Sequence, residues 1–244
     1  MIKINNLTKK YKDKLAVDNL NLEIKTGELF SLLGTNGAGK TTTIKMLSTL
    51  ILPTSGEVEI NNLDLVKDSS KIKEIINISP QETAVAYNLT VLENLYFMAG
   101  IYQIPNKEDK IKELIKLFKL EEVLKQKAKT LSGGYQRKLS IAISLINNPK
   151  ILFLDEPTLG LDVISRHDLW KVIEALKGKT TIILTTHYME EAEVLSDRIG
   201  IMNKGKLIEL GTSKELIKKA KTKNFEDAFI KIIEEDNNEN TNIC

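Results

Sequence analysis

Alternating and continuous apolar positions near the start of the chain predict β-strands. Residues 20–24 (LNLEI) alternate apolar and polar side chains, as a half-buried strand does. Residues 29–34 (LFSLLG) form a mostly apolar run that ends in glycine, which is typical of a buried central strand. Residues 55–60 (SGEVEI) combine a turn with a strand whose Val58 and Ile60 share one face. The first sixty residues are therefore predicted to be rich in strands.

The middle of the chain has helical periodicity instead. Thr90 and Glu93 have the spacing of a capping box, in which two free donors at a helix start are paired. Residues 107–119 place apolar side chains at helical spacing, and a further helix follows Gly134. We therefore predict that residues 84–148 are mainly helical.

The strand pattern returns after the helical segment. Residues 151–156 (ILFLDE) and 180–187 (TTIILTTH) are apolar runs that predict buried strands. Between them, residues 163–178 form an amphipathic pattern with Gly178 as the expected helix end. A short helix over 188–195 and a hairpin over residues 198–210 complete the prediction.

The end of the chain differs from the rest in composition. Residues 231–244 are polar, and the segment 236–242 (DNNENTN) is short of apolar side chains. Such a segment buries too little apolar surface to offset the entropy of ordering, so we expect a disordered tail. Residues 1–230 are long enough for a sizeable core, and we expect them to form one domain.

Charge and cysteine content narrow the function classes. The chain has 35 basic and 33 acidic residues, a net charge of +2, which is too weak a basic excess to indicate a nucleic-acid partner. The lysine-rich runs at 9–14 and 218–223 are read as solvated faces, with attraction to a membrane surface as the alternative. Cys244 is the single cysteine, so no disulfide can form within the chain, as suits a reducing cytosol.

Hydropathy indicates no membrane segment. Residues 1–11 lack the apolar stretch of a signal peptide, and no apolar run approaches the ~20 residues of a membrane-spanning helix. If the protein acts at a membrane, we expect a separate chain to cross it.

Residues 34–41 (GTNGAGKT) match the phosphate loop G-x-x-x-x-G-K-[ST] between a predicted strand and a predicted helix. Backbone N–H groups of such a loop close around phosphate, and the helix N-terminus favours the same charge. Lys40 is expected to reach the β- and γ-phosphates of ATP, and the Thr41 hydroxyl to bind Mg²⁺. An ordinary glycine-rich turn is the alternative, which the flanking elements disfavour. The predicted ATP-binding residues are Gly34, Asn36, Gly37, Ala38, Gly39, Lys40, Thr41 and Thr42.

Two acids end the apolar run at 151–156. Asp155 lies where ligands gather in open α/β sheets and is a candidate for the Mg²⁺ site. Glu156 can accept a proton from the attacking water or orient it. A pair of solvated acids at a strand end is the alternative, and the nearby phosphate loop disfavours it.

Two further side chains are candidates for the same site. His187 also ends an apolar run, where it can hydrogen-bond the γ-phosphate; a structural histidine is the alternative. His167 lies in an amphipathic helix and is read as a surface or packing residue. The amide oxygen of Gln81 can bind Mg²⁺ or the attacking water, although spacing alone favours an ordinary polar loop residue.

Taken together, these motifs resemble the ATP-binding subunits of ABC transporters. The resemblance covers about residues 1–230 and rests on the phosphate loop at 34–41, Gln81, LSGG at 131–134, ILFLDEP at 151–157, GLD at 160–162 and His187. It implies an α/β fold with a P-loop NTPase core of parallel sheet and helices, an N-terminal antiparallel β subdomain and an inserted α-helical subdomain. Tyr11 resembles the aromatic residue on which adenine stacks.

The resemblance also implies a head-to-tail dimer, a homodimer or a heterodimer, with two shared ATP molecules. Ser132, Gly133 and Gly134 open a predicted helix, whose free N–H groups suit the partner's γ-phosphate. The resemblance places Asp162 at the same shared site.

Three positions depart from the commonest family pattern. Tyr135 follows LSGG where glutamine is usual, Leu159 replaces a serine before GLD, and Thr35 replaces a proline. None of the three removes a predicted catalytic group. Tyr135 and Leu159 are expected near the dimer interface, where they bear on how the copies pair.

Residues 185–212 and 224–229 resemble the export class of the family, which includes efflux ATPases for drugs, antibiotics and sodium. The resemblance implies a separate transmembrane permease that docks beside Gln81, near residues 87–91, at the cytoplasmic face of the membrane. An importer ATPase and a soluble ABC protein acting on ribosomes or DNA are the alternatives. The latter class commonly has two such domains or a long coiled coil, and one phosphate loop is seen here.

Overall fold

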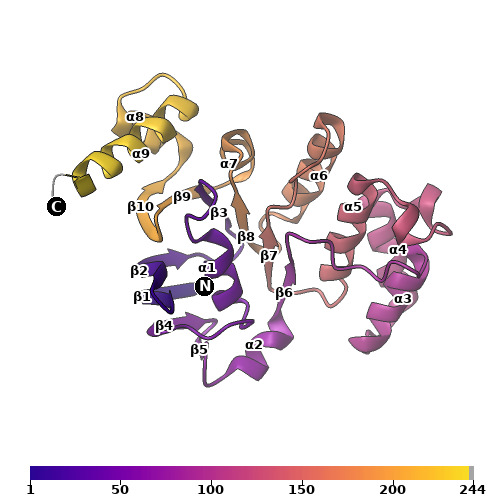
Figure 1. Ribbon diagram of the computed structural model, residues 1–244. Coiled ribbons are helices and arrows are strands. Elements are labelled where there is room, and N and C mark those ends of the chain that lie inside the picture. The colour runs from indigo at the N-terminus through magenta and orange to yellow at the C-terminus, as the bar shows by residue number, and fades with distance from the viewer. Residues whose placement is uncertain (242–244) are drawn as a thin grey trace.

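Two β-sheets and the helices around them form the fold of residues 1–241, which the computed structural model describes, with side chains through residue 238 (Figure 1). The strands are β1 (Ile2–Tyr11), β2 (Lys14–Ile24), β3 (Leu29–Gly34), β4 (Ser55–Ile60), β5 (Leu63–Asp64), β6 (Ile76–Ser79), β7 (Ile151–Asp155), β8 (Thr181–Thr186), β9 (Arg198–Asn203) and β10 (Lys206–Gly211). The α-helices are α1 (Lys40–Leu47), α2 (Ser69–Ile75), α3 (Val91–Ile101), α4 (Lys107–Phe118), α5 (Gly133–Ser144), α6 (Val163–Leu176), α7 (Met189–Leu195), α8 (Ser213–Ala220) and α9 (Phe225–Thr241).

The larger sheet has the strand order β10-β9-β3-β8-β7-β6. All neighbours are parallel except β9 and β10, which form the predicted hairpin. On β7, Leu152 and Leu154 pack toward α3 to α6, whereas Ile151 and Phe153 pack with α1 and the smaller sheet. A strand covered on both faces needs apolar side chains at successive positions, which explains the continuous apolar runs. The predicted parallel core is confirmed.

The smaller sheet comes from the first part of the chain and has the order β2-β1-β4-β5, with antiparallel pairing. Its buried Ile2, Ile24 and Ile60 share one core with Ile44 and Leu47 of α1. Helix α1 therefore packs between the two sheets, as Figure 1 shows. This packing sets the helix rigidly beside the end of β3, where the phosphate loop begins.

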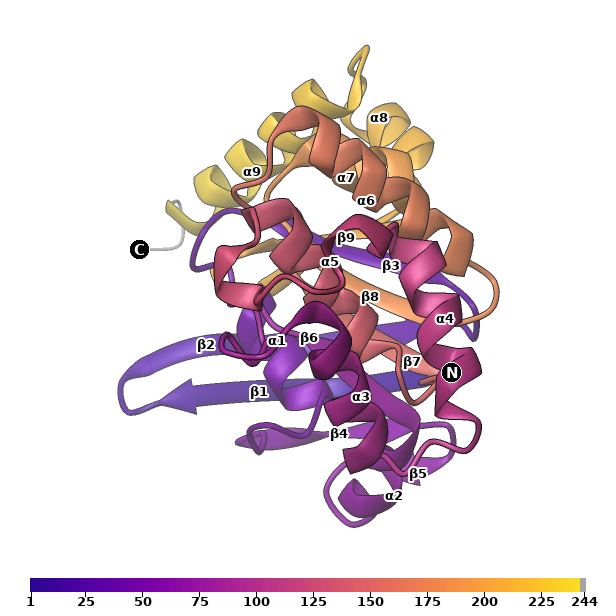
Figure 2. The same cartoon turned by 90° about the vertical axis from the view of Figure 1, so that its right-hand side faces the viewer.

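The segment between β6 and β7 contributes helices that pack on one side of the larger sheet, well seen in Figure 2. Helix α3 begins at the predicted capping box: Thr90 Oγ1 accepts from the Glu93 amide at 3.2 Å, and Glu93 Oε2 accepts from the Thr90 amide at 2.8 Å. The apolar faces of α4 and α5 are buried in the core, where they contribute Leu114 and Leu139. The inserted helical region of the fold is confirmed, while its boundaries at 84–148 remain a prediction.

Helix α9 corrects the prediction for the end of the chain. The disordered tail expected from residue 231 is wrong for residues 231–241, which continue this helix. Ile232 is buried in a cluster with α7, α8 and β9, and Asn203 Nδ2 donates a 2.7 Å hydrogen bond to Asp236 Oδ2. These contacts order a polar segment whose composition alone favours disorder. Residues 242–244 of the predicted tail lie outside the described residues.

None of the helices in residues 1–241 combines the length and the apolar character that a bilayer crossing needs.

Candidate functional site

The predicted site residues come together at one edge of the larger sheet. Strands β3, β6, β7 and β8 are parallel, so their carboxyl ends lie side by side. The chain leaves β3 at Gly34, leaves β6 toward Gln81, leaves β7 at Asp155 and Glu156, and leaves β8 at His187. Four segments that are far apart in sequence therefore meet in one place.

The phosphate loop enters α1 through Gly39. Its φ of 104° lies in the left-handed region that favours glycine, and a Cβ there would lie 2.5 Å from the carbonyl oxygen of Ala16. Gly39 offers no side-chain cap to α1. The first N–H groups of the helix are thus left for an anion, in the field of the helix dipole.

Lys40 is the buried cation of the site. Its Nζ donates to the carbonyl oxygens of Gly34 at 2.7 Å and Thr35 at 3.1 Å, and lies 3.7 Å from Glu156 Oε1. Burial lowers the pKa of Lys40, and the nearby Glu156 and Asp155 oppose this effect. An ammonium held in a poorly solvated place by backbone carbonyls attracts a phosphate more strongly than one in water.

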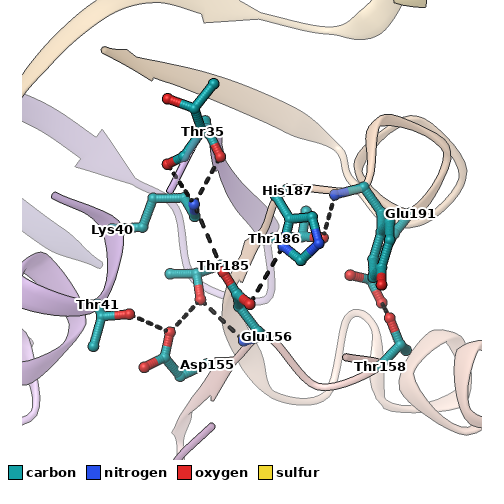
Figure 3. Close-up of polar contacts among 12 residues, drawn as sticks. Thr35, Lys40, Thr41, Asp155, Glu156, Thr158, Thr185, Thr186, His187 and Glu191 are labelled. Atoms are coloured by element: carbon teal, nitrogen blue, oxygen red, sulfur yellow. Dashed lines mark hydrogen bonds and ion pairs between the residues drawn. The ribbon is translucent and has the colours of Figure 1, made fainter. Parts of the chain in front are cut away.

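Asp155 is held by two hydroxyl groups (Figure 3). Its Oδ1 accepts from Thr41 Oγ1 at 3.0 Å and from Thr185 Oγ1 at 2.5 Å. Thr185 Oγ1 in turn accepts a 3.0 Å hydrogen bond from the Glu156 amide. Thr41 and Asp155 were predicted from motifs, whereas Thr185 was not, although its position two residues before His187 places it on the same strand end.

Glu156 lies between the lysine and the histidine. Its side chain is nearly buried, with Oε1 toward Lys40 and Oε2 3.3 Å from His187 Nδ1 (Figure 3). These two atoms do not form a hydrogen bond, and His187 Nδ1 has no other partner among the described residues. Glu156 has a φ of +47°, and such left-handed conformations of non-glycine residues are concentrated at functional sites.

A cavity of about 410 Å³ opens in front of these groups. Its lining residues are Lys14, Ala16, Asn36, Gly37, Ala38, Gly39, Lys40, Thr41, Thr42, Gln81, Glu156, Leu159 and His187. All predicted residues of the phosphate loop except Gly34 are among them, and Gly34 binds Lys40 through its carbonyl oxygen.

An adjoining hollow of about 420 Å³ is lined by all three residues predicted to bind Mg²⁺, namely Thr41, Gln81 and Asp155. Within the described residues, no group of three or more His, Cys, Asp or Glu side chains gathers as a metal site. Mg²⁺ in nucleotide sites uses one or two carboxylates together with phosphate and water, so one carboxylate, one hydroxyl and one amide oxygen fit this ion.

Tyr11 lies beside the cavity, outside its described lining. It ends β1, is 45% exposed as a residue, and has Lys9 Nζ 5.0 Å from its ring centroid. In the sheet it pairs with Lys14, which does line the cavity together with Ala16. Motif reading missed Lys14 and Ala16, because their position depends on how β2 folds back along β1.

Arg137 of α5 ties the helical segment to this edge of the sheet. Its guanidinium donates to four backbone carbonyl oxygens, those of Pro80 at 2.5 Å, Gln81 at 3.2 Å, Pro157 at 2.7 Å and Asp155 at 2.8 Å. Burial lowers its pKa to about 10, opposed by nearby acids, so the group stays charged near pH 7. The segment at Pro80 and Gln81 and the segment at residues 155–157 therefore share one cation.

The Ser-Gly-Gly turn, residues 132–134, lies apart from the cavity of its own chain. Ser132 and Gly133 are exposed, and none of the three residues is among the described residues of the lining. A Cβ on Gly134 would lie 2.9 Å from Ser165 Oγ, and this hydroxyl donates a 2.7 Å hydrogen bond to Oδ2 of Asp162, the N-cap of α6. The predicted shared residues thus form a second surface.

Comparison with known proteins decides the family. The profile of the family described as "ABC transporter" matches residues 17–159, more than half of the chain. The chain belongs to the ABC transporter family. The matched range includes the phosphate loop, the Ser-Gly-Gly turn and the strand-end acids Asp155 and Glu156. This ABC ATPase is therefore an ATP-binding protein.

Named relatives of this ABC ATPase include transport proteins. It is 39% identical to a probable multidrug ABC transporter ATP-binding protein of Escherichia coli, over 99% of this chain and 43% of the relative. It is 40% identical to a linearmycin resistance ATP-binding protein of Bacillus subtilis, over 88% of this chain and 70% of the relative. The chain therefore spans less than half the length of the E. coli protein.

The fold of this ABC ATPase matches solved structures. An ATP-binding cassette described as dimeric, in a post-hydrolysis state and bound to ADP and Pi, superposes with a TM-score of 0.79 at 30% identity. The match covers 87% of this chain and 98% of that cassette. The predicted fold class is confirmed.

Proposed function

We propose that the chain is the ATP-hydrolysing subunit of a membrane exporter. Two copies, or one copy and a similar chain, close around two ATP molecules and drive a separate transmembrane permease. The observation that carries the hydrolytic part is the group of Lys40, Glu156 and His187, which face one another across the cavity in front of the phosphate loop.

The chemistry follows from the residues around the cavity. The N–H groups at the start of α1 and the Lys40 ammonium bind the β- and γ-phosphates. Glu156 accepts a proton from the attacking water, and His187 orients the γ-phosphate, as the bond between that phosphate and ADP breaks. The products are ADP and inorganic phosphate.

Thr41, Asp155 and Gln81 are the proposed holders of Mg²⁺. When bound there, Mg²⁺ would neutralise negative charge on the phosphates of ATP. The hydrogen bond from Thr41 to Asp155 keeps both oxygens close together, and Thr185 fixes the carboxylate from the other side. Tyr11 is proposed to stack on adenine from its exposed place beside the cavity.

The Ser-Gly-Gly turn supports the dimer. Ser132 and Gly133 are exposed at the start of α5, and Asp162 lies exposed at the start of α6. The buried cation of α5, Arg137, donates to backbone carbonyl oxygens at the ends of β6 and β7. The solved cassette described as dimeric supports a pairing in which each turn completes the site of the other copy.

Export is supported by the names of the relatives, one a probable multidrug protein and one a linearmycin resistance protein. The permease is proposed to dock near residues 87–91, at the cytoplasmic face of the membrane. Exposed aromatic side chains support this place, since Tyr87 is 48% and Phe97 is 54% exposed on neighbouring parts of the chain. Such apolar groups suit a protein partner.

Glu156→Gln tests the hydrolytic part. The amide keeps the shape of the side chain but cannot accept the proton, so turnover of Mg-ATP is expected to fall by roughly 10²–10⁴. A fluorescent ATP analogue measures binding, which should change little. Glu122→Gln is the matched control, because Glu122 is an exposed acid that is not among the residues lining the cavity. Turnover of the Glu156→Gln variant close to the parent value would remove Glu156 from this role.

Transport is tested with the permease itself. The chain is expected to co-purify with a candidate permease from detergent extracts, and the pair's ATPase rate to rise with an exported drug or antibiotic. Tyr87→Asp should release the permease while the ATPase rate of the isolated chain is kept. Stimulation only by a compound moving inward in vesicles would favour an importer.

A further inference from the structure

Glu191 is a buried acid outside the cavity. It lies in the first turn of α7, is fully buried, and its Oε1 accepts hydrogen bonds from Thr158 Oγ1 at 2.8 Å and Trp170 Nε1 at 3.0 Å. Its Oε2 is also buried and makes no hydrogen bond among the described residues, while the Thr186 side chain lies close enough to lower the pKa of the carboxyl. A buried polar atom without a partner is costly, so the position calls for a reason beyond packing.

The contacts of Glu191 join two segments of the site. Thr158 follows Glu156 by two residues and leads into the exposed loop that ends at Asp162. Glu191 follows His187 by four residues, and α7 begins between them. Figure 3 shows the Glu191 side chain reaching from α7 toward Thr158, with His187 and Glu156 between the phosphate loop and this contact.

Charged groups around Glu191 come from two other helices. Arg166 of α6 is the cation that attracts its carboxylate, and the Arg166 guanidinium lies 4.5 Å from the Tyr188 ring centroid. The charge of Glu191 also raises the pKa of Arg137 of α5, against the effect of burial. Burial nevertheless raises the pKa of Glu191. An apolar side chain would avoid this desolvation, because replacing buried ionic groups by apolar ones is often neutral or stabilising.

We propose that Glu191 is a positioning residue for ATP hydrolysis, holding Thr158 so that the segment with Glu156 and the segment with His187 keep a fixed relation. The proposal rests on the proposed function of Glu156. A carboxyl that binds a loop through one hydroxyl sets the loop's distance from α7, and displacement of reacting groups by about 1 Å can cost 10²-fold in rate. The same contact fixes the start of the loop that carries Leu159 and Asp162 to the dimer surface.

The test compares Glu191→Gln with Glu191→Leu in the full chain. The glutamine oxygen still accepts from Thr158 and Trp170, so kcat is expected to stay within about 3-fold of the parent. Leucine removes the acceptor, and kcat is expected to fall by about 10- to 100-fold. Affinity for a fluorescent ATP analogue should stay within about 3-fold in both variants, because Glu191 does not line the cavity.

Thr158→Val and Trp170→Phe separate positioning from stability. Each removes one hydrogen bond to the same oxygen, but only Thr158 belongs to the segment after Glu156. Positioning predicts a fall in kcat of at least about 10-fold for Thr158→Val and less than about 3-fold for Trp170→Phe. Thr158→Val also keeps the test decisive if Glu191→Leu does not fold.

Parent-like kcat in Thr158→Val or in a folded Glu191→Leu variant would overturn the proposal. So would a loss of kcat that runs parallel to a loss of ATP-analogue affinity, or one that Glu191→Gln does not rescue. Glu156→Gln is measured beside them: parent-like turnover there overturns the proposed function itself, whereas an inactive Glu156→Gln with an active Glu191→Leu overturns only the role of Glu191.

Discussion

Helices α1 and α5 both begin at glycine-containing turns, yet their first turns have different surroundings. Helix α1 starts at Gly39 without a side-chain cap, and Lys40 and the acids of β7 surround it. Helix α5 starts at Ser132, whose Oγ accepts from the Tyr135 amide at 3.4 Å, and its turn is exposed. The start of α1 is suited to bind an anion within its own chain, whereas the start of α5 is exposed at the surface.

The difference shows that the start of a helix needs a nearby cation and a cavity, in addition to its free N–H groups, to bind a phosphate. The dipole and the free N–H groups exist at both helices. At α1, a buried ammonium and a cavity of about 410 Å³ accompany them. At α5 the turn is exposed, and in the proposed dimer a second copy of the chain supplies the ammonium and the cavity. The predictions that follow change one side of this comparison at a time.

The largest effect is expected from Lys40→Ala. Loss of the buried cation should lower turnover by about 10²–10³, the scale of one lost electrostatic contact to a reacting group. Lys138→Ala in α5 is the matched control, because Lys138 contacts Asp168 at 3.4 Å and no phosphate-loop residue. ATPase rates and binding of an ATP analogue are measured for both. Equal losses in the two variants would contradict the contrast between the helices.

A second prediction concerns Arg137, which ties α5 to the segments at the ends of β6 and β7. Arg137→Lys keeps the charge but cannot reach four carbonyl oxygens in two segments, so the free energy of unfolding should fall by about 1–3 kcal/mol. Urea denaturation of the nucleotide-free chain measures this. An unchanged midpoint would mean that the guanidinium does not hold these segments together.

The smallest effects are expected from one substitution made at both helix starts. Gly39→Ala places a Cβ against the Ala16 carbonyl at a φ of 104° and should destabilise the chain by about 1–3 kcal/mol. A Cβ on Gly133 meets no described atom within 4 Å, and Gly133→Ala should stabilise by about 0.4–1 kcal/mol. Thermal unfolding without nucleotide gives both signs. Two changes of the same sign would contradict the account.

Local motifs made much of this site predictable. The phosphate loop, the acids after β7 and His187 each follow an apolar run, and parallel strands bring their ends together. The capping box at Thr90 was equally readable, since its two partners are three residues apart.

Contacts between segments that are distant in sequence could not be predicted from the sequence pattern. Arg137 is a polar position in a helical pattern, and only the fold shows that it is buried among four carbonyls. Among the acids of residues 190–193, periodicity does not tell which one is buried, and the structure selects Glu191. Strand β1 was not singled out because its pairing has irregular register, which disrupts simple alternation.

The central claim, that the Ser-Gly-Gly turn completes the site of a second copy, is tested most directly by Ser132→Arg in a Glu156→Gln background, where bound ATP is not consumed. Size-exclusion chromatography with light scattering gives the mass with and without Mg-ATP, and Ser70→Arg, at an exposed serine in the first turn of α2, is the control. We expect dimers with ATP for the control, and monomers for Ser132→Arg that still bind the ATP analogue with nearly parent affinity. ATP-dependent dimers of Ser132→Arg, or loss of its nucleotide binding as a monomer, would contradict the claim.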